Sequence, residues 1–263
     1  LLVKQDVIMV FDTHLHTEIS SDSEMKIEEA IKQAKALNLG LIITEHMDLF
    51  YPEDNKFIFD VEQFFQNYEQ YRSDKLLLGI EVGMQLKCVT EIKEIIKKNN
   101  FDFVLGSIHM VEGIDIYHQE YYQQSKEEAY NKYFKAMTDC IKAFEDIDSL
   151  GHIDYIARYA VYEDKEMYYE IFQEAYDKLL KTLAQADKAL EINTRRLTDP
   201  RAIAVLLPVY KRFKQLGGKY VTIGSDAHKV CDIGANFSEG NKIAAACGLR
   251  PVFFKERKIE YAK

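Results

Sequence analysis

The sequence predicts an α/β barrel, in which parallel strands form the wall and helices cover the outside. The chain has 263 residues, and α/β barrels of about 250 residues routinely fold as one domain. Short apolar runs alternate with longer amphipathic stretches, which is typical of a parallel sheet covered by helices. Polar residues follow nearly every predicted strand instead of gathering at one switch point, which favours a barrel over an open doubly wound sheet. We therefore expect a single domain that spans residues 1–263.

Seven strand–helix units follow one another along the chain. We expect strands at residues 7–11, 41–44, 76–82, 103–105, 147–150, 189–192 and 220–223. We expect helices at residues 25–37, 61–71, 88–98, 126–145, 166–185, 200–216 and 238–246. The first helix shows the pattern, since apolar residues recur at 27, 30, 31, 34 and 37 before Asn38 and Gly40 end it. Two irregular loops, residues 47–60 and 110–124, follow strands, where barrels commonly carry functional residues.

The composition excludes several classes of protein. Acidic residues number 43 and basic residues 34, so the formal net charge is −9, which argues against nucleic-acid partners and against docking on anionic membranes. No stretch approaches the roughly 18–20 apolar residues of a membrane span. The cysteines are scattered without a CxxC pair, as is typical of reduced thiols in a cytoplasmic protein. They are Cys88, Cys140, Cys231 and Cys247.

Histidines mark the carboxyl ends of the predicted strands. Six of the seven histidines fall there, and His118 is the exception. The six are His14, His16, His46, His109, His152 and His228. Because side chains at positions i and i+2 of a strand point the same way, His14 and His16 are expected to form a two-pronged ligand. Asp226 and His228 have the same spacing and form a second candidate pair.

Three carboxylates, Glu81, Asp226 and Asp22, accompany these histidines. Imidazole and carboxylate ligands together suit Zn, Mn or Fe. The set is too large for one tetrahedral ion, but it suffices for two or three divalent ions that share a bridging carboxylate. Asp22 has an equally simple interpretation as the N-cap of the helix predicted at residues 25–37. A lone HxH motif is a weak signal, whereas six histidines at one end of the same barrel favour a polynuclear metal site.

The order of these motifs resembles the PHP (polymerase and histidinol phosphatase) superfamily. The resemblance covers residues 9–250 and implies a distorted (βα)7 TIM-like barrel with a trinuclear metal centre. Three further motifs indicate which members of the superfamily the chain resembles most. They are Gly-Ser-Ile-His109, Gly-His152-Ile-Asp154 and Glu191-Ile-Asn193-Thr. These motifs imply a cytoplasmic enzyme of histidine biosynthesis that hydrolyses L-histidinol phosphate to L-histidinol and phosphate.

The resemblance also implies a layout of ligands. The first metal takes His14, His16, Glu81 and Asp226. The second metal shares Glu81 and takes His109 and His152. The third takes His46, His228 and Asp22, at a position where some relatives carry histidine. Zinc is the expected metal, with Mn or Fe as alternatives. The expected catalytic residues are Asp226, Glu81 and His228.

We hypothesise that a hydroxide bridging two metals attacks phosphorus in line, because clustered metals activate water and neutralise phosphoryl charge. Arg158 and Arg195 lie just beyond two strand ends and are expected to bind the phosphate, since a guanidinium pairs two oxygens at once. For each arginine an ordinary surface ion pair is the alternative. The amine and imidazole of the substrate are expected to meet acids near the mouth, with Glu112, Asp115 and Asp154 as candidates.

Two other functions stay open at this point. The chain can be a PHP hydrolase of another phosphoester, such as a phosphotyrosine protein or a nucleotide. It can also be a non-catalytic barrel that binds metal, although the complete ligand set disfavours this alternative. The predicted partner is a small-molecule phosphomonoester, and the sequence indicates no oligomeric state.

Overall fold

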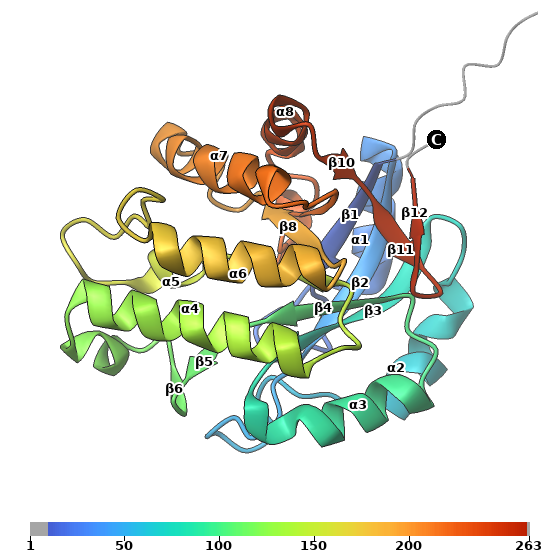
Figure 1. Ribbon diagram of the computed structural model, residues 1–263. Coiled ribbons are helices and arrows are strands. Elements are labelled where there is room, and N and C mark those ends of the chain that lie inside the picture. Colours follow the sequence, from blue (N-terminus) through green and yellow to red (C-terminus); the bar gives the residue numbers. More distant parts are fainter. Residues whose placement is uncertain (1–9, 262–263) are drawn as a thin grey trace, which may run out of the picture.

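The predicted strands form one parallel sheet that curls into a barrel (Figure 1). The computed structural model describes residues 10–261. The strands follow the order β1 (Val10–Leu15), β2 (Leu39–Met47), β3 (Leu76–Gly83), β4 (Phe103–Ser107), β7 (Ser149–Leu150), β8 (Ala189–Asn193), β9 (Tyr220–Gly224) and β10 (Arg250–Pro251). The sheet closes where the backbone N–H of His16 donates to Ala227 at 2.9 Å and that of Asp226 donates to His14 at 2.8 Å. The predicted α/β barrel is confirmed.

Helices cover the outer face of the sheet, and α4, α6 and α7 lie side by side along one flank (Figure 1). The helices are α1 (Ile27–Leu37), α2 (Val61–Tyr68), α3 (Val89–Lys98), α4 (Lys126–Ala143), α5 (Ile156–Tyr159), α6 (Gln173–Gln185), α7 (Pro200–Gln215) and α8 (Phe237–Cys247). The local sequence explains where two of these helices begin. Ser125 and Glu128 form a reciprocal capping box at α4, and Asp199 caps α7 immediately before Pro200.

Two predicted boundaries were wrong by four residues or more. The first strand, expected at residues 7–11, extends to Leu15 and so includes His14, whereas residues 7–9 lie outside the described part of the chain. The helix expected at residues 166–185 begins only at Gln173, and Glu166, in the segment before it, instead accepts a hydrogen bond from Arg196 at 2.5 Å. The sequence also did not predict α5 or the hairpin of β5 (Met110–Val111) and β6 (Ile114–Asp115).

The barrel interior is apolar at one end and polar at the other. On β2, Ile42 belongs to an apolar cluster inside the barrel, and His46, four residues further, lies beside Glu81. On β3, Leu77 belongs to the same cluster and Glu81 follows after four residues. Residues at this spacing face the same side of a strand. β2 and β3 therefore each contribute an apolar residue near the start and a polar residue near the end to the interior.

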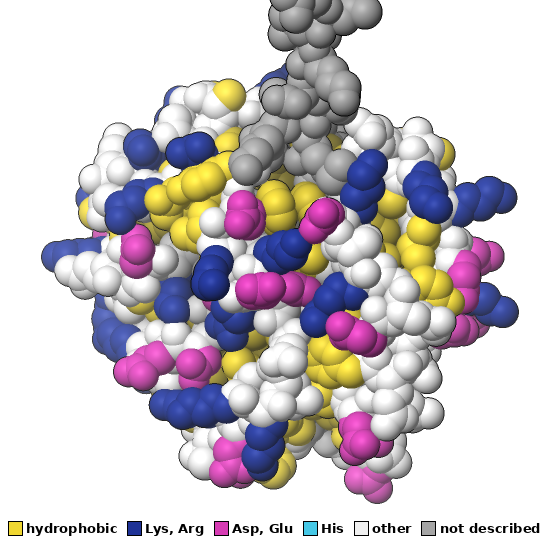
Figure 2. All heavy atoms as spheres, turned by 90° about the vertical axis from the view of Figure 1, so that its right-hand side faces the viewer, with side chains coloured by type: hydrophobic (Ala, Val, Ile, Leu, Met, Phe, Trp, Pro, Cys, Tyr) yellow, Lys and Arg dark blue, Asp and Glu magenta, His cyan; other side chains and the backbone are white. Residues whose placement is uncertain are grey.

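A C-terminal hairpin, β11 (Phe253–Lys255) and β12 (Lys258–Glu260), covers the apolar end. Phe254 lies against Phe103 with ring centroids 5.4 Å apart, and Phe253 stacks on Phe11 at 4.0 Å. Figure 2 shows the side of the molecule on which this hairpin lies, where lysine and arginine are interspersed with acidic side chains. Among residues 10–261, no helix is both long and apolar enough to span a bilayer.

We predict that Phe254→Ala destabilises the metal-loaded protein by about 3 kcal/mol, because it leaves a cavity beside Phe103 in the inner apolar cluster. Denaturant unfolding measures this change. The matched control is Ile171→Ala, since Ile171 is 64% exposed and its truncation should change stability by less than about 0.5 kcal/mol. Equal effects of the two substitutions would contradict the role assigned to the hairpin.

Candidate metal centre

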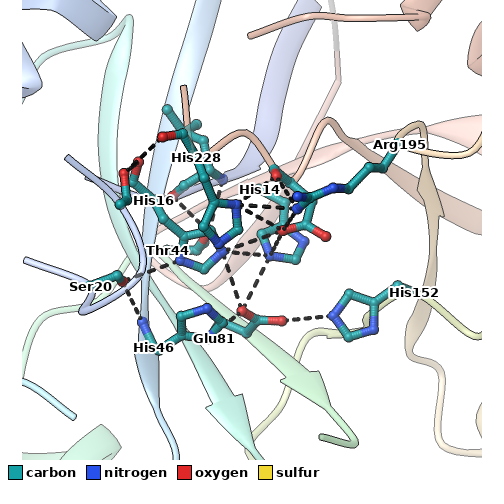
Figure 3. Close-up of polar contacts among 12 residues, drawn as sticks. His14, His16, Ser20, Thr44, His46, Glu81, His152, Arg195 and His228 are labelled. Atoms are coloured by element: carbon teal, nitrogen blue, oxygen red, sulfur yellow. Dashed lines mark hydrogen bonds and ion pairs between the residues drawn. The ribbon is translucent and has the colours of Figure 1, made fainter. Parts of the chain in front are cut away.

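The polar end of the barrel brings all nine predicted ligands together. Figure 3 shows His14, His16, His46, His152 and His228 around Glu81. The nine ligands come from the ends of six strands. The ligands are His14 and His16 at the end of β1, Asp22 in the following loop, His46 in β2, Glu81 in β3, His109 after β4, His152 after β7, and Asp226 and His228 after β9. Long-range parallel pairing therefore gathers residues that lie as much as 214 positions apart in the sequence, from His14 to His228.

Glu81 lies at the centre of this cluster and is fully buried. Its Oε1 accepts a hydrogen bond from Ser107 Oγ at 2.7 Å. Five histidine nitrogens lie within 3.4 Å of its two oxygens, namely those of His152 (3.0 Å) and His109 (3.4 Å) at Oε1, and of His46 (3.0 Å), His14 (3.3 Å) and His16 (3.4 Å) at Oε2. A carboxylate in this position can be shared by several cations.

The donor set fits divalent metal ions. The Nε2 atoms of His14 and His16 lie 3.1 Å apart, and those of His109 and His152 lie 3.5 Å apart. Such convergence of imidazole nitrogens is typical of groups that share a cation. Glu81 Oε2 is buried without a regular hydrogen-bond partner, which leaves an acceptor for such an ion. Five overlapping triads have all their donor atoms within 4.8 Å of one another. Glu81 with His109 and His152, and Glu81 with His14 and His16, are two of them.

The electrostatics of the cluster depend on its carboxylates. Burial alone lowers the pKa of His46, but the charges of Glu81 and Asp22 outweigh burial and raise it to about 10. Burial likewise opposes the charged form of His14, yet Glu81, Glu191 and Asp226 raise its pKa well above the ordinary value. The cluster without metal therefore holds protons on these two imidazoles at neutral pH.

Asp22 joins the cluster and does not cap a helix. Its carboxylate lies 3.0 Å from His228 Nε2 and 3.5 Å from His46 Nε2, whereas α1 begins after Lys26. Burial raises the pKa of Asp22, but hydrogen bonds from the two histidines outweigh burial and hold it well below the ordinary value. His228 Nδ1 donates to the backbone oxygen of Asp226 at 2.9 Å, so its Nε2 is the nitrogen available to a cation.

Two further buried carboxylates hold the loops that carry ligands. Glu45 accepts hydrogen bonds from the backbone N–H groups of Thr17 (3.0 Å) and Ser20 (3.1 Å), which shape the loop between His16 and Asp22. Asp12 accepts from the backbone N–H of Ser225 at 2.9 Å and from its hydroxyl at 2.5 Å. Ser225 precedes Asp226, whose backbone has a φ of 55°, so Asp12 stabilises a turn that is unfavourable for a residue other than glycine.

The two predicted phosphate-binding arginines lie on either side of Asp226. The side chain of Arg158 is 8% exposed. It donates to Asp226 Oδ2 at 2.6 Å and to Asn193 Oδ1 at 2.7 Å, and its Nε has no partner. Arg195 is 44% exposed, and its guanidinium lies 3.5 Å from Asp226 Oδ1 and 3.3 Å from His228 Nδ1. Positive charge is thus placed at the edge of the cluster.

A cavity of about 300 Å³ opens beside the cluster. His46, Asp48 and His109 line its inner end, and its walls include Tyr51, Asp115, Tyr155 and Tyr159. Asp115 is 7% exposed and accepts a hydrogen bond from Tyr51 at 2.7 Å. His118, the histidine with no predicted role, lines the same cavity. The cavity combines aromatic surface with carboxylates, which suits a cationic or heteroaromatic group.

The other two acids expected at the mouth have different surroundings. Asp154 is buried and accepts a hydrogen bond from Arg196 at 2.8 Å. Arg196 also binds Glu166, so this arginine belongs to a buried ion-pair network. Glu112 is exposed, pairs with Lys132 at 2.8 Å and lines a separate cavity. Asp115 is therefore the one of the three candidate acids that lines the cavity beside the cluster.

The sequence did not lead us to predict that Asp48 belongs to this site. Asp48 Oδ1 accepts a hydrogen bond from His109 Nδ1 at 2.8 Å, which leaves Nε2 of His109 to face Glu81. A Cβ atom on Gly83 would lie 2.0 Å from the same oxygen, so glycine makes room for the carboxylate. The spacing of two residues between His46 and Asp48 was a signal that could have placed Asp48 on the same side of the chain.

Comparisons with known proteins agree on one family. A family model described as "PHP domain" matches residues 12–195. The chain is 49% identical over 255 residues to a probable histidinol-phosphatase of Clostridium acetobutylicum, covering 97% of this chain and 100% of the relative. It is 36% identical over 225 residues to the histidinol-phosphatase of Lactococcus lactis subsp. lactis, covering 82% and 83% of the two chains.

A solved structure shares the fold. The crystal structure of histidinol phosphate phosphatase from Lactococcus lactis subsp. lactis, in complex with zinc, L-histidinol and phosphate, superposes with a TM-score of 0.88. The two chains are 33% identical, and the match covers 97% of this chain and all of the other. The similarity therefore extends over the barrel and the ligand loops alike.

We predict that zinc binding at pH 7.5 releases protons. His46, with a pKa of about 10, and His14 are protonated in the metal-free cluster and must lose a proton before they can donate a lone pair. Calorimetric titration in two buffers of different ionisation enthalpy measures the number released, and we expect more than about one proton per chain. Zinc affinity should accordingly fall as the pH falls.

Elemental analysis of the same samples provides the control, and we expect two or three ions per chain. A binding heat that does not depend on the buffer would contradict the protonated state of the metal-free cluster. Fewer than one ion per chain after growth with metals supplied would contradict the metal centre itself.

Proposed function

This chain belongs to the PHP domain family, and on that premise we propose that it is a metal-dependent phosphomonoesterase that hydrolyses L-histidinol phosphate to L-histidinol and phosphate. The observation that carries the proposal is a polynuclear ligand cluster that adjoins an acidic, aromatic cavity. A phosphate monoester that also carries an amine and an imidazole matches both parts. We further propose that the whole chain is one such domain and that it works in the cytoplasm, where its cysteines stay reduced.

We assign the metal ligands to three positions, of which the first two share Glu81. The first position has His14, His16, Glu81 and Asp226, the second has Glu81, His109 and His152, and the third has Asp22, His46 and His228. Zinc is the proposed metal, which agrees with the zinc in the related L. lactis structure. Divalent ions supply Lewis acidity, which lowers the pKa of water and neutralises the charge of a phosphoryl group.

The residues of the chain keep the reacting groups in place and in the required charge state. Burial opposes ionisation of Asp226, but Arg158 and His14 outweigh burial and hold its pKa well below the ordinary value. Asp226 is therefore a carboxylate at neutral pH, and it can accept a proton but not supply one. Glu81 is held ionised in the same way, since its histidine neighbours outweigh the effect of burial on its pKa.

Arg158 and Arg195 are the proposed phosphate ligands. Both guanidinium groups lie next to Asp226, so a phosphoryl group at the cluster meets positive charge from the chain as well as from the ions. Arg195 is partly exposed and can turn toward a substrate, whereas Arg158 is fixed by Asp226 and Asn193. A guanidinium suits this role because its planar donors pair with two phosphate oxygens at once.

The cavity is the proposed place of the L-histidinol group. Asp115 and Asp48 offer carboxylates to the amine or to a protonated imidazole, and Tyr155 and Tyr159 offer ring faces. The tyrosine rings lie with their centroids 5.0 Å apart, and Tyr155 also packs against His109 at 5.1 Å. The cavity proposed to bind L-histidinol, the leaving group, is therefore directly adjacent to the metal ligands at which the phosphoryl group reacts.

A phosphate-release assay over four substrates tests the function. The panel consists of L-histidinol phosphate, p-nitrophenyl phosphate, a phosphotyrosine peptide and a nucleotide. We expect kcat/KM for L-histidinol phosphate to exceed the other values by at least about tenfold, or ~1.4 kcal/mol. A smaller preference would refute the proposed substrate, and a higher value for the peptide or the nucleotide would favour another PHP hydrolase.

We predict that Asp115→Asn raises KM for L-histidinol phosphate about tenfold or more, because a hydrogen bond to a charged group contributes roughly 1.5–3 kcal/mol. The same variant should leave KM for p-nitrophenyl phosphate unchanged, since that substrate has no cationic group. Glu112→Gln decides between the two acids: Glu112 lines the other cavity, so we expect no change in either KM. A rise in KM with Glu112→Gln alone would reverse the assignment.

A further inference from the structure

Glu191, in the Glu191-Ile-Asn193-Thr motif, has no role in the function derived above. It lies in β8, is fully buried and accepts three hydrogen bonds. Its Oε1 accepts from His14 Nδ1 at 2.7 Å. Its Oε2 accepts from the backbone N–H of His152 at 2.6 Å and from Asn193 Nδ2 at 3.2 Å. One carboxylate therefore contacts two of the candidate metal ligands.

The two contacts act on the ligands in different ways. When the ring of His14 is neutral, the hydrogen bond to Glu191 keeps its proton on Nδ1. The lone pair is then on Nε2, which lies 3.3 Å from Glu81 Oε2. The hydrogen bond from the backbone N–H of His152 fixes the chain just beyond β7. It therefore also fixes the backbone position from which the His152 side chain extends. In our layout these histidines belong to two different metal positions.

The surroundings are built to hold Glu191 in this place. A Cβ atom on Gly224 would lie 2.4 Å from Glu191 Oε1, so only glycine fits there on β9. The hydroxyl of the buried Tyr210 in α7 donates to the backbone oxygen of Glu191 at 2.9 Å. Asn193, which donates to Glu191, also accepts from Arg158, the partner of Asp226. The network thus extends from Glu191 to a third candidate ligand.

We propose that Glu191 is a positioning residue that sets the affinity of two metal positions at once, through the side chain of His14 and the backbone of His152. This inference rests on the proposed metal centre. Carboxylates that orient metal-binding histidines typically contribute a factor of about 10–100 to metal affinity. Glu191 differs from a partner such as Asp48, which accepts a hydrogen bond from one ligand, His109.

Glu191→Gln tests this role because glutamine has the same shape but cannot satisfy both contacts. If the amide oxygen faces His14, the amide NH2 meets the N–H of His152 and the amide group of Asn193, so donors face donors. If the amide is reversed, its NH2 faces Nδ1 of His14 and favours the tautomer that carries a proton on Nε2. Either orientation weakens metal binding.

The readout is the zinc dissociation constant, measured by competition with a chromophoric chelator, together with thermal unfolding of the metal-free protein. We expect Glu191→Gln to weaken zinc binding about 10–100-fold at two of the sites, whereas Asp48→Asn weakens it at one. The matched control is Asp148→Asn, because Asp148 is also buried and accepts a backbone N–H (Val104, 2.8 Å) and a side-chain donor (Arg257, 2.6 Å). Asp148 contacts none of the candidate ligands in these bonds, so its variant should lose stability and keep zinc affinity within about threefold.

A purely structural role for Glu191 would lower the unfolding temperature and leave zinc affinity as in Asp148→Asn, and this result would overturn the inference. Should Glu191→Gln not fold, Glu191→Asp keeps the charge but is too short to span both contacts. It should then weaken zinc binding at least about threefold, and unchanged affinity would again overturn the inference. Zinc binding without hydrolysis of L-histidinol phosphate would contradict the proposed function alone, and a lack of zinc binding by the unchanged chain would contradict both.

Discussion

The barrel is arranged around one buried carboxylate, Glu81, with five imidazole groups within 3.4 Å of its oxygens. A buried charge without compensation is unfavourable by several kcal/mol, so this group requires positive charge nearby. In the metal-free protein, protons on His14 and His46 supply it, which is why their pKa values are raised. In the loaded protein divalent ions take over, so metal binding, proton release and stability are linked through the same carboxylate.

The rest of the fold makes this concentration of polar groups possible. Parallel strands separate the interior into an apolar end, closed by the C-terminal hairpin, and a polar end that carries the ligands. The loops at the polar end cannot rely on strand pairing for their backbone N–H groups. Asp12, Glu45 and Glu191 provide acceptors for those groups in Ser225, in Thr17 and Ser20, and in His152. Each of these three carboxylates accepts hydrogen bonds with both of its oxygens, which holds the loops in the fixed positions that a metal site needs.

The proposed substrate has two unlike ends, and the site has two corresponding parts. In the proposed function, the phosphoryl end binds at the ligand cluster beside Arg158 and Arg195, which both lie next to Asp226. The cationic end is proposed to bind in the cavity, which is lined by Asp48, Asp115 and tyrosine rings. His109 lies between the two parts, since it faces Glu81 on one side and donates to Asp48 on the other. The two proposed binding regions are therefore directly adjacent.

The sequence by itself determined the fold class, the seven strand–helix units and the residues at the strand ends, because periodicity and strand direction are local properties of the chain. It did not determine the pairing of carboxylates with partners distant in sequence. Arg196, 42 positions from Asp154, binds that acid, whereas Asp115, on an unpredicted hairpin, lines the cavity. The parts of Asp48 and Glu191 were likewise decided only by the tertiary structure. Their partners His109 and His14 lie 61 and 177 positions away. Parallel pairing of β2, β3 and β4 brings Asp48 and His109 together, and barrel closure brings Glu191 and His14 together.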